Sequence, residues 1–211
     1  MNQSIKKISG SAVPLRLNNV DTDQIMPKQF LRGIDKQGLA AGLFHDMKTN
    51  ADGTLKSDFI LNQAQYKEAN ILISGTNFGC GSSREHAVWG LRQYGFQAII
   101  APSFAEIFHA NALNNRLLLI TLAEDMINDL VDECTRHPEH ILTIDIENLH
   151  LHSQAGLRTS FHLNARHHAM MLDGHNLTQS TLEHQVAIRD FMHNYWKQRP
   201  WAKNVGQSIT H

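Results

Sequence analysis

Three short apolar runs, separated by segments of helical character, constrain the fold of this 211-residue chain more than any other feature. The runs are residues 71–73, 98–101 and 117–120, and helical segments at 84–94 and 103–114 lie between them. Uninterrupted apolar strands that alternate with helices are typical of a parallel sheet with right-handed crossovers and both faces covered. We therefore expect ligands to bind at the loops that follow these strands.

The flanking segments have weaker patterns. Residues 12–17 predict a short strand, and residues 35–58 predict one short helix in a long excursion, of a kind more often functional or mobile than core. A helix is expected at 124–136, followed by half-buried antiparallel strands at 143–146 and 149–152. Turns at Asn148 and Gly156, a strand at 159–163 and helices near 165–172 and 181–198 complete the prediction. The predicted class is mixed α/β with an antiparallel annex.

Composition excludes several classes of function. Nineteen Lys and Arg residues against 20 Asp and Glu give a formal charge of -1, so no basic field is available to hold a nucleic acid. The two cysteines, Cys80 and Cys134, are too few for an iron–sulfur cluster, a Cys-rich zinc site or a disulfide scaffold. No apolar run approaches the roughly 20 residues of a membrane span, so we expect a cytoplasmic setting without membrane contact.

The Gly-rich segment 75–87 has the densest chemistry, because it joins a buried strand to a helix. Glycines let the backbone approach a ligand, and the N–H groups at a helix start favour an anion. Arg84 adds a fork of donors that fits a carboxylate or a phosphate. No Lys follows Gly81, as a Walker A loop requires, and the dinucleotide fingerprint fits only as an isolated Gly79-x-Gly81. An anionic substrate is therefore expected, and a nucleotide is not.

Helix capping offers a plainer interpretation of the same residues. Three Ser-x-x-Glu patterns have the form of capping boxes, beginning at Ser82, Ser103 and Ser180. Ser82 taken alone is better explained as a cap, and Arg84 alone as a solvated residue of a first helical turn. The case for a site rests on the coincidence of a Gly loop, two serines, Arg84 and His86 within a few residues. The adjacent His167 and His168 point apart on a helix, so we expect solvated side chains and no metal site.

Two sequence strings support a family resemblance. Residues 77–87, NFGCGSSREHA, resemble the signature of 3-isopropylmalate dehydratase small subunits, the swivel-domain partners in the aconitase superfamily. Residues 19–31, NVDTDQIMPKQFL, are similar to the family's opening motif, and residues 101–108 with Asn114-Asn115 to its second strand–helix unit. The resemblance runs in the right order over most of residues 12–172.

The resemblance implies a swivelling three-layer β/β/α domain over residues 1–211, with a C-terminal helical extension from about residue 165. It implies interconversion of 2- and 3-isopropylmalate through the dehydrated alkene, in leucine biosynthesis. It also implies a large-subunit partner that carries a 4Fe-4S cluster, whose iron takes the substrate hydroxyl while a base takes the proton. The implied site residues of this chain are Ser82 as base, Arg84 for a substrate carboxylate, Gly81 and Ser83 beside them, and Leu31 and Arg32 in the loop that selects the substrate side group.

Alternatives remain at this stage. Leu119 and residues 172–180 depart from the family's usual pattern, although neither touches the implied site. A related hydro-lyase acting on another small dicarboxylate, such as the methylmalate formed from citraconate, is one alternative. A non-catalytic domain that binds anions with the same Gly loop is another.

Overall fold

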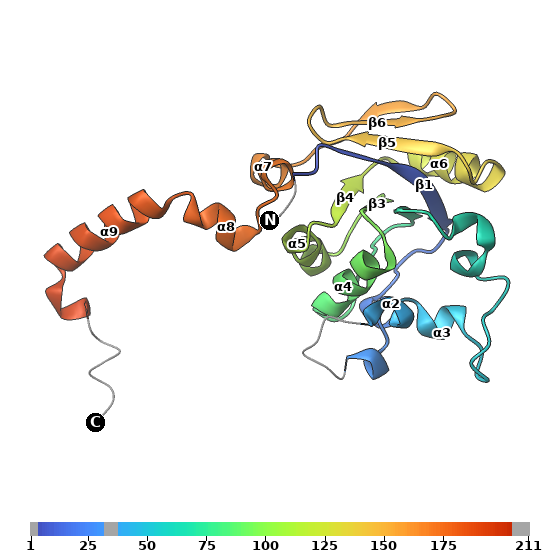
Figure 1. Ribbon diagram of the computed structural model, residues 1–211, viewed down its shortest axis with the longest axis horizontal. Helices are drawn as coiled ribbons and strands as arrows, with labels where there is room; N and C mark the ends of the chain where they lie inside the picture. Colours follow the sequence, from blue (N-terminus) through green and yellow to red (C-terminus); the bar gives the residue numbers. More distant parts are fainter. Residues whose placement is uncertain (1–3, 32–37, 204–211) are drawn as a thin grey trace.

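The computed structural model describes residues 4–31 and 38–203, and in this part seven strands form one sheet in the order β4-β3-β2-β1-β5-β6-β7 (Figure 1). The strands are β1 (Lys7–Leu15), β2 (Ile71–Ser74), β3 (Ala98–Ala101), β4 (Leu118–Thr121), β5 (Ile141–Asp145), β6 (His150–Ser153) and β7 (Arg158–Ser160). Strands β1 to β4 are parallel, and β5, β6 and β7 continue the sheet antiparallel. The predicted mixed class, with a parallel core and an antiparallel annex, is confirmed.

The parallel strands are buried on both faces. Ala12, Ile71, Ala98 and Leu118 pair in a single row across β1 to β4. These four side chains belong to one hydrophobic cluster, whereas Leu72, the next residue after Ile71, belongs to the cluster on the opposite face. Burial of successive residues on opposite faces explains why these strands are uninterrupted apolar runs rather than alternating ones.

Helices cover the two faces of the sheet. On one face lies α6 (Glu124–Arg136), whose Leu130 is fully buried against the strands. The other face is covered by α4 (Glu85–Tyr94) and α5 (Glu106–Asn114), with Leu91 of α4 in its core. In Figure 1 the strands lie between these two layers. The loops at the carboxyl ends of β1, β2 and β3 are therefore held on a rigid platform.

The segment between β1 and β2 packs against α4 and is part of the core, whereas the sequence predicted a long excursion of a kind more often functional or mobile than core. Its elements are α1 (Thr22–Ile25), α2 (Leu39–Gly42), α3 (His45–Lys48) and three 3₁₀ turns, η1 (Lys28–Phe30), η2 (Ile60–Asn62) and η3 (Ala64–Tyr66). Leu43, Phe44 and Tyr66 are buried in the cluster that contains Leu91. The described part of residues 35–58 holds two short helices rather than one, because its apolar residues are needed to cover that face of the sheet.

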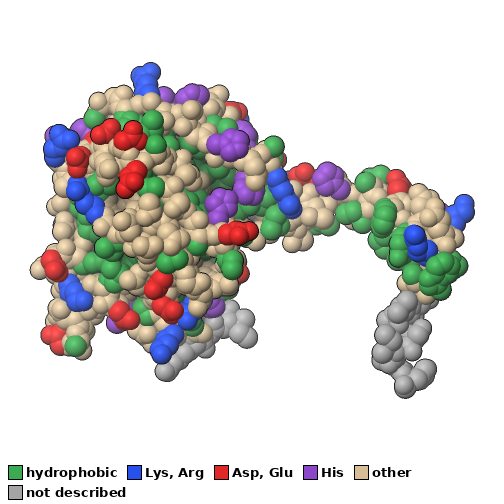
Figure 2. Space-filling view, turned by 180° about the vertical axis from the view of Figure 1, so that it is seen from behind, with side chains coloured by type: hydrophobic (Ala, Val, Ile, Leu, Met, Phe, Trp, Pro, Cys, Tyr) green, Lys and Arg blue, Asp and Glu red, His purple; other side chains and the backbone are tan. Residues whose placement is uncertain are grey.

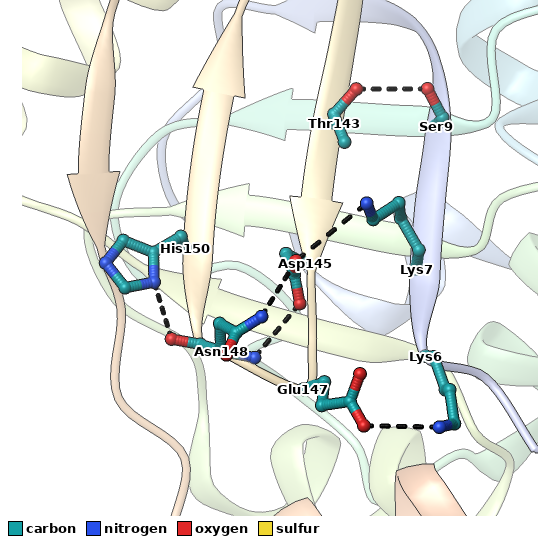
Figure 3. A network of polar contacts seen from close by, with 8 residues as sticks. All are labelled: Lys6, Lys7, Ser9, Thr143, Asp145, Glu147, Asn148 and His150. Carbon is teal, nitrogen blue, oxygen red and sulfur yellow. Dashed lines mark hydrogen bonds and ion pairs between the residues drawn. The ribbon is translucent and has the colours of Figure 1, made fainter.

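Polar side chains join β1 to the antiparallel annex, as Figure 3 shows. Ser9 and Thr143 share a hydrogen bond of 3.1 Å, and Lys7 lies 3.9 Å from the carboxylate of Asp145. The same carboxylate accepts a hydrogen bond from the backbone N–H of Asn148 at 3.0 Å. Asn148 thus stabilises the predicted turn between β5 and β6, and Gly156, with a φ of 102°, occupies the next predicted turn.

The three predicted capping boxes are absent from the described residues. Helix α4 begins after Arg84 and α5 begins after Ala105, and neither helix has a side-chain cap. The Ser103 hydroxyl instead accepts a hydrogen bond of 2.8 Å from the backbone N–H of Asn77. Ser180 lies inside α8 (Leu177–Leu182), which Asn176 caps. Long-range hydrogen bonds hold Ser82 and Ser103 away from the helix starts, whereas at Ser180 a local capping box formed by Asn176 and Gln179 starts the helix four residues earlier.

The C-terminal helices leave the body of the molecule. Helix α7 (Ala165–Asp173) packs on the sheet through Met171, and its Met170 is equally buried at 2% exposed. Beyond it α8, α9 (Gln185–Gln198) and η4 (Pro200–Ala202) project away from the sheet, and we call residues 177–203 the arm (Figure 1). The single helix predicted at 181–198 is thus two helices. Within the described residues no helix is long and apolar enough to cross a membrane.

The expectation of solvated side chains at His167 and His168 is wrong. His168 lies 2.7 Å from the carbonyl oxygen of Ile146 through its Nε2 atom, and both histidines are half-buried. The ring of His167 lies 5.5 Å from the ring of His109 on α5. The two rings do point in different directions, but each meets the body of the protein because α7 docks on it.

Candidate active site

The Gly-rich loop 75–84 follows β2 and is held on one side by the loop that follows β1. Asn19 donates its backbone N–H to Thr76 at 2.8 Å, and Gly79 donates to Val20 at 2.7 Å. Thr22 donates its backbone N–H to Cys80, also at 2.8 Å. The family-like strings at 19–31 and 77–87 are therefore hydrogen-bonded to each other, although about 50 residues separate them.

The loop that follows β3 holds the other side. Phe78 donates its N–H to the carbonyl of Ser103 at 3.1 Å, and the N–H of Ala105 returns a hydrogen bond to Phe78 at 3.0 Å. Three consecutive strand ends thus converge on one loop. This is the edge of a parallel sheet where ligands are expected.

Two glycines of this loop have left-handed backbones. Gly79 has a φ of 79°, and a Cβ added there would overlap the ring of Phe108 on α5. Gly81 has a φ of 89° and lies beside Asp21. Gly79 therefore lets the loop pack closely on α5, and Gly81 turns the chain toward Ser82.

Ser82 has a backbone fixed by hydrogen bonds and an exposed side chain. Its carbonyl oxygen accepts hydrogen bonds from the Thr22 hydroxyl at 2.8 Å and from the Arg84 N–H at 2.7 Å. Ser82 and Ser83 are both exposed. In the described part of the chain the Ser82 hydroxyl has no hydrogen-bond partner. Because Arg84, not Ser82, precedes the first turn of α4, this hydroxyl is not occupied by capping.

Arg84 forms an ion pair with Asp23 of α1. The Arg84 side chain is 24% exposed, and that of Asp23 is 54% exposed. The neighbouring Glu85 carboxylate accepts a hydrogen bond from the side-chain amide of Asn115 at 2.6 Å, which holds it toward α5. Asp23 was missed as a functional candidate because its contact with Arg84 spans 61 positions of sequence, and its only signal was membership of the family-like string at 19–31.

The loop at 28–33 is only partly described. Leu31 follows η1, is half-buried and packs against the cluster beneath α4. Arg32 lies outside the described residues. The structure thus places Gly81, Ser82, Ser83 and Arg84 together and Leu31 on the α4 side of the sheet.

The two cysteines do not fit an iron–sulfur cluster. Cys134 is 1% exposed within α6, where burial raises the pKa of its thiol to about 12. Cys80 is half-buried in the Gly-rich loop, and its sulfur lies 3.4 Å from the carbonyl of Asn19. These thiols belong to different parts of the fold, and a cluster needs three or four thiolates.

Comparisons with known proteins agree with this geometry. The family model described as "Aconitase C-terminal domain" matches residues 2–125. The 3-isopropylmalate dehydratase small subunit 1 of Chromobacterium violaceum is 50% identical over 199 residues, which cover 94% of this chain and 93% of the relative. The chain belongs to the family of 3-isopropylmalate dehydratase small subunits.

Two further members of this family show how far the likeness extends. The small subunit of Brucella canis is 41% identical over 196 residues, or 93% of this chain and 98% of the relative. A solved structure of 3-isopropylmalate dehydratase from Methanocaldococcus jannaschii has a TM-score of 0.65 and 27% identity, over 87% of this chain and 98% of the other. The chain therefore has the swivel-type fold of that protein. The alignments with the Chromobacterium and Brucella relatives cover 94% and 93% of this chain, so they include most of the arm.

Proposed function

We propose that this chain, as the small subunit of a 3-isopropylmalate dehydratase, works with a large subunit to interconvert 2-isopropylmalate and 3-isopropylmalate through 2-isopropylmaleate. The reaction is that of a hydro-lyase in leucine biosynthesis. The observation that carries the proposal is the exposed hydroxyl of Ser82, which has no partner among the described residues, beside the ion-paired Arg84 on a loop that three strand ends hold in place. We also propose that residues 1–211 form one swivel domain with a helical extension from about residue 165.

Ser82 acts as the base that moves a proton at the carbon next to a substrate carboxylate. A hydroxyl is a weak base, so it needs positive potential to favour the alkoxide. Arg84 and the N–H groups at the start of α4 supply such potential within this chain. The hydrogen bonds to the Ser82 carbonyl fix its backbone, and the residue is exposed, so a substrate can reach the hydroxyl.

Arg84 binds one substrate carboxylate, with Gly81 and Ser83 lining the same surface. A guanidinium has five donors, so Arg84 can keep one interaction with Asp23 and still present N–H groups to the substrate. Asp23 thus orients the side chain before substrate arrives. The substrate is a small dicarboxylate, and pairing with Arg84 accounts for one of its two charges.

The large subunit completes the site. The loop 81–84 is open to solvent, and a second surface is needed to enclose a substrate and exclude water. Because the two cysteines here are too few for a cluster, we place the 4Fe-4S cluster on the large subunit, where it would supply a Lewis acid for the substrate hydroxyl. Ser82 and Arg84 of this chain act on the proton and on a carboxylate, and Leu31 belongs to the loop that selects the side group.

Reconstitution with the purified large subunit and a panel of alkylmalates tests the proposal. The kcat/KM should be highest for isopropylmalate, and Leu31→Ala should change the ratio of activities on isopropylmalate and methylmalate by the equivalent of about 1–3 kcal/mol. A higher kcat/KM for methylmalate would assign the chain to a related hydro-lyase. Absence of turnover on every alkylmalate would favour a non-catalytic anion-binding domain.

A further inference from the structure

The arm exposes a helix that has no covering surface. Every residue from 181 to 194 is exposed, although this stretch contains most of α9. Phe191 is 67% exposed, and Trp201 beyond the helix is 74% exposed. Isolated helices shorter than about 12–15 residues are marginal in water, so a helix like α9 gains its stability from packing. The space-filling view shows hydrophobic side chains gathered on the outer part of the arm (Figure 2).

Four apolar side chains form a stripe along α9. Ile188, Phe191, Met192 and Tyr195 are spaced as i, i+3, i+4 and i+7, so they share one face of α9. The rings of Phe191 and Tyr195 stack 5.7 Å apart. The opposite face carries mainly polar residues, among them His193, and one exposed apolar residue, Val186. This pattern is the one by which an amphipathic helix binds an apolar groove of a partner protein.

Basic residues flank the stripe at its C-terminal end. The Arg199 guanidinium lies 4.9 Å from the ring centre of Tyr195, and Lys203 Nζ lies 5.8 Å from that of Trp196. Within residues 184–203 the only acidic residue is Asp190, against four Lys and Arg residues. The complementary surface is therefore an apolar groove with carboxylates at one end.

We infer that the stripe on α9 is a docking surface for the large subunit, an inference that rests on the proposed function. The exposed residues of the loop 81–84 are too few to supply the roughly 800 Å² per partner of a stable interface. A second contact at the arm would add area, and it would raise the effective concentration of one subunit at the other's site. The bacterial relatives named small subunits align over most of the arm, so they share this length of chain.

The test is the dissociation constant of the purified full-length chain for the purified large subunit, measured by calorimetric titration. Phe191→Glu should weaken the complex about 10- to 100-fold, since it places a charge in the centre of an apolar contact. His193→Glu adds the same residue to the opposite face and should leave the affinity within about twofold of wild type. Because both side chains are exposed, the melting temperature of the isolated chain should not change. Saturating amounts of Phe191→Glu should restore the wild-type kcat, since the arm takes no part in the chemistry.

Other outcomes would overturn the inference. Equal affinity of both variants for the large subunit, with an active wild-type complex, would exclude the arm and leave the proposed function intact. If Phe191→Glu kept its affinity for the large subunit but no longer formed a dimer with another copy of this chain, the stripe would be assigned to contact with that second copy. If Phe191→Glu lost binding to vesicles of phosphatidylcholine and phosphatidylglycerol while its affinity for the large subunit was unchanged, the stripe would be assigned to a membrane surface. A wild-type chain that neither binds nor activates the large subunit would overturn the proposed function as well.

Discussion

Ser82 shows how one residue can satisfy two sequence interpretations until its neighbours are known. Its position three residues before Glu85 is that of a capping serine, yet α4 begins after Arg84, and the Ser82 hydroxyl has no partner in the described part of the chain. The carbonyl of Ser82, not its hydroxyl, makes the structural hydrogen bonds. Removal of the hydroxyl should therefore affect chemistry and leave folding unchanged.

Ser82→Ala should keep the free energy of unfolding within about 0.5 kcal/mol of wild type, because an exposed and unpartnered hydroxyl is lost. Turnover of the reconstituted enzyme should fall by on the order of 100-fold or more, if Ser82 is the base. Ser103→Ala is the matched control, since its hydroxyl accepts the Asn77 N–H, and its loss should cost about 1 kcal/mol. Denaturant unfolding and steady-state turnover measure the two effects, and an active Ser82→Ala complex would remove Ser82 from the mechanism.

Arg84→Lys should retain the fold and lose most of the activity. A lysine ammonium can still pair with Asp23, but it cannot present a fork of donors to a substrate carboxylate at the same time. The expected result is a raised KM together with a lowered kcat, measured by steady-state kinetics of the reconstituted enzyme. Wild-type values of both constants would limit Arg84 to its ion pair with Asp23.

At the scale of elements, the close packing of the Gly-rich loop on α5 depends on Gly79. Its Cβ-free backbone lies against Phe108, and Phe78 makes an edge-on contact with the same ring at a centroid distance of 5.4 Å. A side chain at Gly79 would separate the loop from α5 and displace Ser82 and Arg84 with it.

Gly79→Ala should lower the free energy of unfolding by about 2–4 kcal/mol, because backbone strain adds to overlap with Phe108. Gly53→Ala isolates the strain alone, since Gly53 has a φ of 85° with open space around it, and should cost only about 1 kcal/mol. Chemical denaturation of both variants gives the comparison. Equal losses would show that the loop can move away from Phe108 without cost.

The contact between α5 and α7 should make stability depend on pH. Burial lowers the pKa of His109 below its usual 6.5, and burial, then the charges of His109 and Arg166, lower the pKa of His167. Both histidines thus bind protons more readily in the unfolded chain, so stability is fully present above pH 6.5 and falls as the pH drops below that value. Urea unfolding between pH 7.5 and 5.5 should show this loss, and His109→Gln should reduce it. An identical pH dependence in wild type and variant would exclude this pair as the cause.

At the scale of the whole molecule, the cysteine count predicts that the iron–sulfur cluster and the site residues of this chain belong to two different subunits. The purified chain should be colourless and inactive, because Cys134 is buried and Cys80 stands alone in its loop. Activity should appear only when the large subunit is added. Absorbance spectra and an assay of alkene formation test this directly, and dehydration of isopropylmalate by this chain alone would contradict it.

Much of this molecule could be predicted from local sequence. The strand at 98–101 and the helix at 124–136 were predicted to the residue, because apolar periodicity and the burial it reports are properties of neighbouring residues. The Gly-rich loop at the end of a buried strand could be found in the same way. The family strings located Ser82 and Arg84 within that loop, but their roles remain proposals.

Contacts between residues far apart in the sequence could not be predicted in this way. The pairing of Arg84 with Asp23, the use of the Ser103 hydroxyl by Asn77, and the packing of residues 38–58 on α4 all join separate segments. The arm shows the same limit, since the sequence predicts a helix near 181–198 but not that α9 is exposed. Sequence determined which elements form, since that depends on local periodicity. Only the tertiary structure decided which polar groups are paired, which hydroxyl is free and which apolar face still lacks a cover, because these depend on distances across the fold.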